Sequence, residues 1–137
     1  MDCIFCKIAK DEIPSYKVYE DNKTLAFLDI APVNNGHILV IPKKHYKNIE
    51  DISEEELYTI IKTVKKIGKA LKKSLDIPGY NVNINNDSIA GQIIPHIHFH
   101  IIPRYKNDGL KLWTQGKYRN KEAEKIQNKI QNYFNNI

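Results

Sequence analysis

Three histidines alternate with apolar residues in the run His96-Ile97-His98-Phe99-His100. Successive side chains of a strand point to opposite faces, so this spacing predicts three imidazoles on one face and apolar residues packed into a core behind them. Each imidazole carries two ring nitrogens that need partners. The run therefore predicts a polar site rather than a group of unrelated surface histidines.

Two kinds of chemistry fit such a row. A neutral imidazole can attack phosphorus and form a covalent phosphoramidate, while a neighbouring imidazole donates to the phosphate oxygens or protonates the leaving group. Alternatively, two imidazoles at His-x-His spacing can bind one metal, with a ligand such as His37 arriving from another predicted strand. Spacing alone leaves both interpretations open.

Cys3 and Cys6 form a Cys-x-x-Cys pair near the start of the chain. A redox pair would be expected at a strand-to-helix turn of a βαβ unit, which the sequence does not predict here. A zinc site would need two further ligands from elsewhere. Two ordinary buried thiols are the simplest interpretation.

The elements that must position these residues fit one domain of 137 residues, 42% of them apolar. A capping box at Ser53 and Glu56 begins one long amphipathic helix, which ends before Pro78. Strands pair along the chain around this helix, which predicts the α+β class: an antiparallel sheet with helices packed on one side. The predicted strands are 15–20, 24–29, 37–41, 80–85 and the histidine run; short helices are predicted over 4–8, ended by Pro14, and from 121 onward.

The formal charge of +5 lies mostly in six lysines of the long helix, at positions 62, 65, 66, 69, 72 and 73. They predict a solvated helix face; nucleic-acid binding is the less favoured interpretation, because no arginine cluster or interleaved aromatic residues accompany them. The sequence has no apolar run long enough to cross a membrane and no basic-then-apolar leader. We therefore expect a cytoplasmic protein that binds neither membrane nor nucleic acid.

The histidine run resembles the signature of the histidine triad (HIT) superfamily. The resemblance extends to the Cys-Ile-Phe-Cys-Lys-Ile opening, to Asp29 after Leu-Ala-Phe-Leu, to residues 36–43, to Asn83-Ile84-Asn85-Asn86 and to Gly91-Gln92. This pattern is similar to that of the Hint-type branch. It covers a core of residues 3–105 within a single domain of residues 1–137, and leaves a tail of residues 106–137 outside it.

The resemblance implies a HIT-like fold with a five-stranded antiparallel sheet, one long helix and one or two short ones, the sheet continuing across a homodimer. It implies a nucleotide-binding hydrolase or transferase that acts at the α-phosphate through a nucleotidyl-histidine intermediate, with no catalytic cofactor. A purine nucleoside phosphoramidase, acting on phosphoramidates or acyl-phosphates of AMP or GMP, is the nearest match. The alternatives are a dinucleoside polyphosphate hydrolase and a nucleotide-binding regulatory protein with incidental catalysis.

The resemblance also implies roles for single residues. His98 matches the nucleophile, His100 the residue at the phosphate and leaving group, and His37 and Asn85 supporting polar residues. Asp29 matches the carboxylate that binds the ribose hydroxyls. The expected nucleotide-binding set is Ile4, Phe5, Ile8, Phe27, Asp29, Ile30, Leu39, Asn85, Gly91, Gln92, Ile93, His98 and His100. Ile93 departs from the pattern, because many Hint-type sequences have a hydroxyl or polar residue there; this affects the expected leaving-group preference.

A structural zinc is implied for relatives that carry the cysteine pair. Its other ligands are a histidine after the Pro-Lys-x run and the first triad histidine. Here the four ligands would be Cys3, Cys6, His45 and His96, a closed site without catalytic function.

Overall fold

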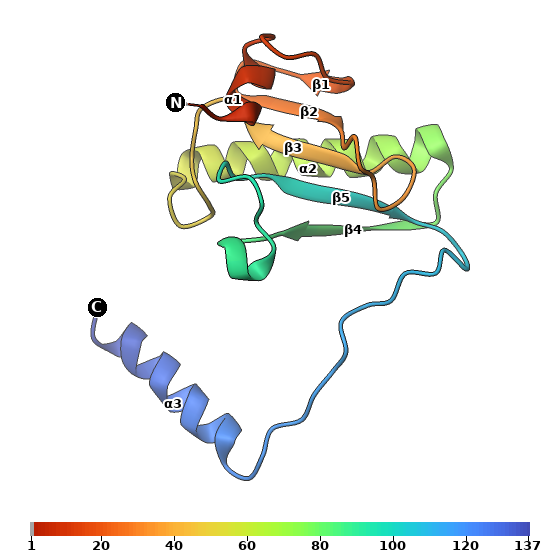
Figure 1. Ribbon diagram of the computed structural model, residues 1–137. Helices are drawn as coiled ribbons and strands as arrows, with labels where there is room; N and C mark the ends of the chain where they lie inside the picture. The colour runs from red at the N-terminus through yellow and green to blue at the C-terminus, as the bar shows by residue number, and fades with distance from the viewer. Residues whose placement is uncertain (1) are drawn as a thin grey trace.

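The computed structural model describes residues 2–137 and is built around a five-stranded antiparallel sheet with strand order β1-β2-β3-β5-β4 (Figure 1). β1 and β4 are therefore the two edge strands. The strands are β1 (Lys17–Glu20), β2 (Thr24–Leu28), β3 (Ile38–Pro42), β4 (Gly79–Ile84) and β5 (Phe99–Arg104). The helices are α1 (Ile4–Ala9), α2 (Glu54–Leu75), the 3-10 turn η1 (Ser88–Ala90) and α3 (Glu122–Asn135).

Both faces of the sheet are covered. On one face α2 packs against a core that includes Ala26, Ile38, Val40, Ile97, Phe99 and Ile101. On the other face α1 packs against Leu25, Phe27, Leu39 and Ile41. The prediction that helices cover one side only is therefore wrong. All five residues of β3 are buried, and such an unbroken apolar strand needs cover on both faces.

The long helix begins and ends as the sequence predicts. The Ser53 hydroxyl accepts a hydrogen bond from the Glu56 amide at 3.3 Å, and Asp76 adopts a left-handed conformation after the last turn. Within α2, Gly68 faces β4 closely: a Cβ there would fall on the ring and hydroxyl of Tyr80. The glycine thus sets how closely α2 approaches the edge of the sheet.

The other predicted elements are present, with boundaries shifted by one or two residues, except that the strand of the histidine run begins three residues late. α1 ends at Ala9, well before Pro14, and Asp11 then takes a φ of 61°. β5 begins at Phe99, so His96 and His98 lie in the segment that leads into the strand. The predicted alternation is nevertheless confirmed, because Ile97, Phe99 and Ile101 all face the α2 core.

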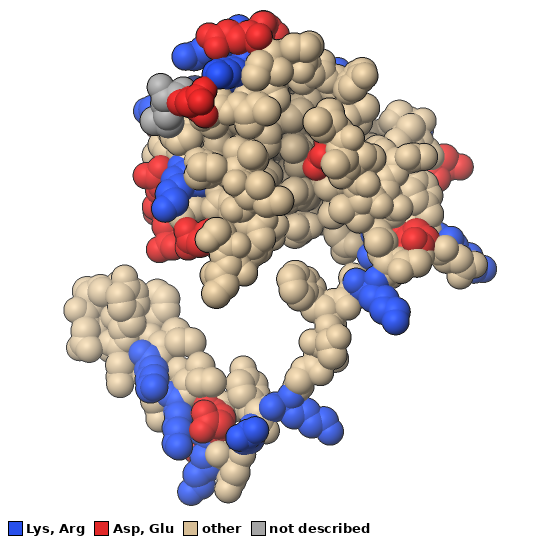
Figure 2. Space-filling model, viewed as in Figure 1, with Lys and Arg blue, Asp and Glu red and all other residues tan. Residues whose placement is uncertain are grey.

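The C-terminal tail extends away from the rest of the protein. Residues 105–121 form no helix or strand, and none of the residues of α3 is buried. Figure 1 shows α3 standing beyond the free edge of β4, and the space-filling view shows an open gap between them with basic side chains on the tail (Figure 2). Among residues 2–137, no helix is both long and apolar enough to span a bilayer.

Candidate functional site

The histidines meet on the face of the sheet that α1 covers. The ring of Phe5 from α1 lies edge-on to His98, with centroids 5.1 Å apart, and to His96 at 5.9 Å. The His98 and His100 ring centroids are 4.9 Å apart, and His37, which immediately precedes β3, lies 5.2 Å from His100. The fold therefore gathers four imidazoles from two separate segments.

Backbone contacts determine which nitrogen of His98 carries a proton. Its Nδ1 lies 2.7 Å from the His96 carbonyl oxygen, and only an N–H can donate to a carbonyl. Nε2 therefore carries the free lone pair. Burial lowers the pKa of His98 below its ordinary value, so the ring is neutral at pH 7. A neutral ring with an unshared lone pair is what a nucleophile needs.

A second chain of contacts orients His100. The Val33 amide donates to Nδ1 of His37 at 3.1 Å, so the proton of His37 is on Nε2. That Nε2–H donates to Nδ1 of His100 at 2.9 Å, which leaves His100 with an N–H on its own Nε2. Burial lowers the pKa of His37 and lowers that of His100 to about 4. His100 thus presents a hydrogen-bond donor beside the lone pair of His98.

Asp29, immediately after β2, places a carboxylate at the same site. Its Oδ2 lies 3.8 Å from Nε2 of His37, and its Oδ1 accepts from the Ala31 amide at 2.8 Å. Asp29, His37 and His100 form a group whose ligand atoms lie within 4.8 Å of one another, and His98 is not part of it. The 2.9 Å separation of the His37 and His100 nitrogens fits a hydrogen bond better than two ligands of one zinc, which would be roughly 3.3 Å apart.

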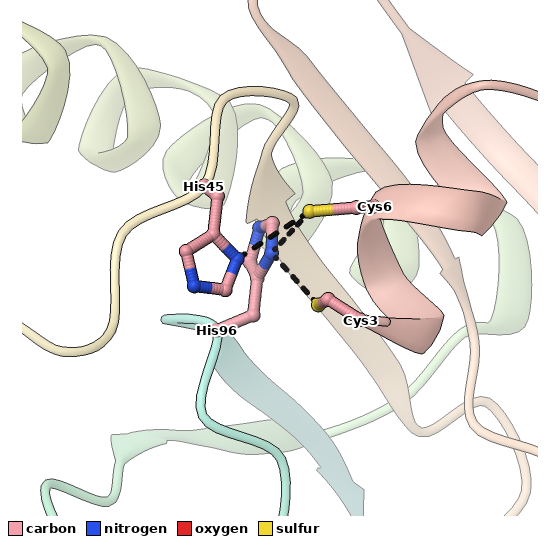
Figure 3. A group of neighbouring side chains, drawn as sticks. All are labelled: Cys3, Cys6, His45 and His96. Carbon is pink, nitrogen blue, oxygen red and sulfur yellow. Dashed lines mark hydrogen bonds between the residues drawn. The ribbon is translucent and has the colours of Figure 1, made fainter. Parts of the chain in front are cut away.

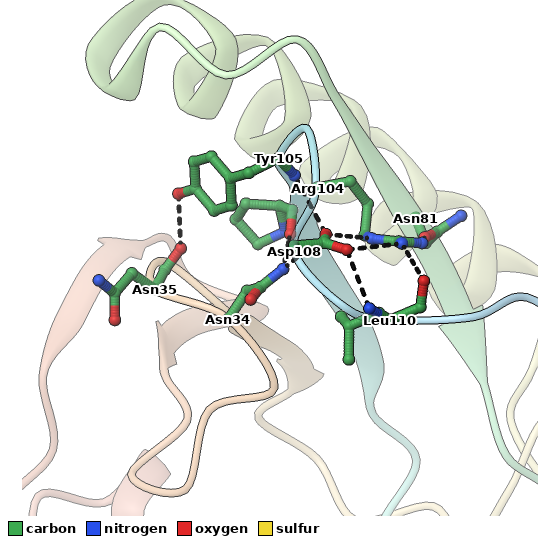
Figure 4. Close-up of polar contacts among 8 residues, drawn as sticks. Asn34, Asn35, Asn81, Arg104, Tyr105, Asp108 and Leu110 are labelled. Carbon is green, nitrogen blue, oxygen red and sulfur yellow. Dashed lines mark hydrogen bonds and ion pairs between the residues drawn. The ribbon is translucent and has the colours of Figure 1, made fainter.

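The loop between Asp29 and His37 is held by a polar network that the sequence did not suggest (Figure 4). The Asn34 amide donates to the Pro103 carbonyl at 2.9 Å and to the Asp108 carboxylate at 3.1 Å. The Tyr105 hydroxyl donates to the Asn35 carbonyl at 2.9 Å. Arg104 binds Asp108 through two nitrogens and holds the pKa of that carboxyl far below its usual range. These contacts fix the loop to the end of β5.

The cysteine pair lies next to this site, in a cluster with His45 and His96 (Figure 3). Nδ1 of His96 lies 3.5 Å from the sulfur atoms of Cys3 and Cys6, and Nδ1 of His45 lies 3.4 Å from the Cys6 sulfur. Sulfur and nitrogen ligands of a tetrahedral zinc are about 3.6 Å apart. His96 donates from Nε2 to the Pro42 carbonyl, which turns its Nδ1 lone pair toward the thiols. The cluster therefore could hold a metal ion.

The expected nucleotide-binding residues are only partly brought together. Phe5, Ile8, Phe27 and Leu39 share one apolar cluster beneath α1, with Ile4 of the same helix partly exposed. Ile30 and Ile93, by contrast, are each 88% exposed and lie outside this cluster.

The loop after β4 supplies the remaining expected residues. The Asn85 amide donates to the Gly91 carbonyl at 3.4 Å, and Gly91 has a φ of 93°, which favours glycine. The side chain of Gln92 is buried and donates to the Lys47 and Ile94 carbonyls. It therefore holds the loop in place, and its backbone amide also bonds within the loop, to the Asp87 carbonyl at 3.2 Å.

The chain matches known proteins along most of its length. Residues 10–107 match the family model described as HIT domain. The chain is 49% identical over 128 residues to an uncharacterized HIT-like protein of Methanocaldococcus jannaschii, covering 93% of this chain and 98% of that protein. It is 49% identical to an adenosine 5'-monophosphoramidase of Schizosaccharomyces pombe, covering 76% of this chain and 75% of the relative. It is 40% identical to an adenylylsulfatase of Arabidopsis thaliana, covering 86% of this chain and 59% of the relative.

Solved structures match the fold. A crystal structure of a HIT family protein from Bacillus anthracis superposes with a TM-score of 0.88 at 39% identity, covering 99% of this chain and 97% of that one. A HIT-like protein from Bartonella henselae superposes with a TM-score of 0.75 at 46% identity, covering 77% of this chain and 81% of that one. The first match includes the C-terminal tail.

Proposed function

The chain belongs to the HIT domain family, and on that premise we propose that it is a purine nucleoside phosphoramidase whose nucleophile is His98. The proposal rests on one observation above all: the hydrogen bond to the His96 carbonyl leaves a lone pair on Nε2 of His98, and the chain of bonds from the Val33 amide through His37 leaves a donor on Nε2 of His100. The relatives named as adenosine 5'-monophosphoramidase support it. Nucleotide hydrolysis is the activity common to the named relatives.

The reaction takes two steps. In the first, Nε2 of His98 attacks the α-phosphorus of an adenosine or guanosine phosphoramidate, the N–P bond to His98 forms and the bond to the leaving amine breaks. The departing amine takes up a proton from solvent, while the Nε2–H of the neutral His100 donates a hydrogen bond to a phosphate oxygen. In the second step water attacks the nucleotidyl-His98, the N–P bond breaks, the proton of the water returns to solvent, and AMP or GMP is released with His98 neutral again. No metal or cofactor takes part in either step.

The surrounding residues suit a purine nucleotide. Phe5, Phe27 and Leu39 offer apolar and aromatic walls for a base, and Asp29 can accept hydrogen bonds from both hydroxyls of a ribose. His37 donates to His100 and thereby fixes its orientation. Asn85 and Gly91 lie at the loop that would face the phosphate.

A substrate panel tests the proposal. Adenosine phosphoramidate should be hydrolysed faster than diadenosine polyphosphates, and His98→Asn should lower the rate at least a hundredfold while AMP still binds. Faster hydrolysis of diadenosine polyphosphates would favour a dinucleoside polyphosphate hydrolase. Near-normal turnover by His98→Asn would contradict the assignment of the nucleophile. If His98→Asn restored cells that lack the protein, a nucleotide-binding regulatory role would be favoured.

The exposed Ile93 bears on the leaving group. Many Hint-type sequences have a hydroxyl or polar residue at this position, and Ile93 cannot supply the side-chain hydrogen bond to the phosphate or leaving group that such a residue would make. The relative named adenylylsulfatase shows that a leaving group other than an amine occurs among similar proteins. We therefore include adenosine 5'-phosphosulfate and an aminoacyl-adenylate in the panel, as a phosphosulfate and an acyl-phosphate of AMP.

We also propose that Cys3, Cys6, His45 and His96 hold a structural zinc. The two thiols and two imidazoles form a closed ligand set, so the ion would cross-link the start of α1 to the segments before α2 and β5. Such a link would keep Phe5 against His98. Equilibrium dialysis with elemental analysis should find one zinc per wild-type chain. The same measurement on a Cys3→Ser, Cys6→Ser double variant should find none.

The assembly we propose is a cytoplasmic homodimer of single-domain chains, each with a core of residues 3–105 and a tail of residues 106–137. β4 is an edge strand, and pairing with its copy would continue the sheet across two chains. Light scattering after size-exclusion chromatography measures the mass directly. A monomer at micromolar concentration would contradict this assembly.

A further inference from the structure

The apolar face of α3 has no partner within the described chain. Ile126, Ile130 and Tyr133 recur at helical spacing, and all three are exposed. The helix has 14 residues. An isolated helix shorter than about 12–15 residues is only marginally stable in water, and most helical stability in proteins comes from packing of an apolar face. This helix therefore needs a surface to pack on.

The position of the tail is shared with a crystallised relative. Residues 106–137 make up nearly a quarter of the chain. A superposition that misplaced all of them could not reach the TM-score of 0.88 found for the Bacillus anthracis protein over 99% of the chain. A tail that keeps the same direction in a crystal is ordered; contacts with Arg104 hold only its first residues, and α3 itself has no buried residue against its own chain.

An apolar groove elsewhere on the protein suits the apolar face of α3. It has a volume of about 460 Å³ and lies between the last turns of α2 and the strands. Leu28, Ile38, Leu71 and Leu75 line it, and the exposed Ala70 stands at its rim. No segment of residues 2–137 fills it. The groove offers apolar walls to a helix that presents isoleucine and tyrosine side chains.

The groove and α3 of one chain lie at opposite ends of the sheet. The groove lies where β2 ends and β3 begins, at the end at which Gly79 starts β4. Figure 1 shows α3 beyond the β4 edge, toward the end at which Ile84 finishes that strand. If β4 pairs with its copy in antiparallel fashion, the Ile84 end of one chain lies beside the Gly79 end of the other. The helix of one chain then lies at the same end as the groove of its partner.

The linker can cover the distance. Contacts from Arg104 to Asp108 and to the Leu110 carbonyl fix the direction in which the tail leaves the sheet. Residues 106–121 can extend to about 50 Å at most, which is more than the width of a domain of this size. Reaching a second copy therefore requires no change in the body.

We propose that α3 docks through its apolar face into the α2 groove of a second copy, and that the two chains exchange these helices reciprocally. The arrangement is closed and two-fold symmetric, so it stops at the dimer. It does not depend on the catalytic proposal. The groove is the docking surface, and the occupant is the C-terminal helix of another copy of this chain.

Hydrogen exchange of the α3 amides measures docking directly in the full chain. At concentrations where the protein is dimeric, these amides should exchange about tenfold or more slowly than in an Ile126→Ser, Ile130→Ser variant. Isoleucine and serine have similar helix propensity, so the variant removes packing rather than helix formation. The matched control, Asn128→Ser with Asn132→Ser on the opposite face of α3, should keep the slow exchange.

Ala70→Arg tests the groove, because it fills an exposed rim position without touching the core. It should speed α3 exchange as much as the tail variant does. The two variants can then be mixed and refolded together. In a mixed dimer the Ala70→Arg chain has an intact α3, and the Ile126→Ser, Ile130→Ser chain has an open groove. The amides of the intact α3 should therefore exchange slowly again. Fast exchange in this mixture, or slow α3 exchange in monomers or in Ala70→Arg alone, would overturn the proposal.

Discussion

Replacing His100 by asparagine should weaken the dependence of stability on pH. Burial, together with the neighbouring His98 and His37, lowers the pKa of His100 to about 4, whereas an unfolded histidine titrates near 6.5. When the pH is lowered from 7 to 5, this histidine becomes mostly protonated in the unfolded chain and stays almost entirely neutral in the folded chain. Stability therefore falls as the pH drops below 6.5, by about 2 kcal/mol from His100 alone at pH 5.

Urea unfolding at pH 7 and pH 5 measures this loss. The wild-type free energy of unfolding should fall by about 2 kcal/mol more between the two pH values than that of His100→Asn, a difference of roughly 1 M in the urea midpoint. The comparison uses the pH slope, so any loss of packing in the variant cancels.

Ile101→Val provides the control. It removes one buried methylene beside His100, costs about 1 kcal/mol at both pH values, and binds no proton. Its pH slope should equal that of the wild type. If His100→Asn also kept the wild-type slope, the buried neutral state of His100 and the donor assigned to it would both be wrong.

Three further predictions concern other parts of the protein. Removing zinc with a chelator should lower the melting temperature by roughly 9 °C, as expected for loss of about 2.7 kcal/mol of ligand stabilisation in a chain of this length, and Cys3→Ser should show no such shift in a calorimeter. Gly68→Ala should lower the free energy of unfolding by about 1–3 kcal/mol in urea, because the new Cβ meets Tyr80; a gain, as helix propensity alone predicts, would contradict the packing described. Asp29→Asn should lower kcat/KM about tenfold or more for a ribonucleotide substrate and much less for its 2'-deoxy analogue, and an equal loss for both would argue against ribose binding.

Side-chain periodicity predicted much of the framework. The alternation around His98 and the helical spacing of apolar residues in α2 both follow from which side chains are buried. Such patterns can be recognised in the sequence alone. The packing side of α1 could not be predicted, because six residues with apolar groups at Ile4, Phe5 and Ile8 fit either face of a sheet. The structure places them opposite α2.

The contacts that fix the proton positions on the histidine rings also could not be predicted from the sequence. The Val33 amide and the His96 and Pro42 carbonyls are backbone groups, which any residue would supply. The cysteine pair was a weak signal by itself, and the family resemblance, rather than spacing, suggested His45 and His96 as its partners.

The account depends most on a covalent bond between His98 and the α-phosphorus. Rapid mixing with adenosine phosphoramidate, quenching in base and intact-mass analysis test it directly. We predict an adenylyl adduct within the first turnover, mapped by peptide sequencing to His98 and absent from His98→Asn. No adduct before AMP release, or an adduct on His100 or His37, would contradict the mechanism.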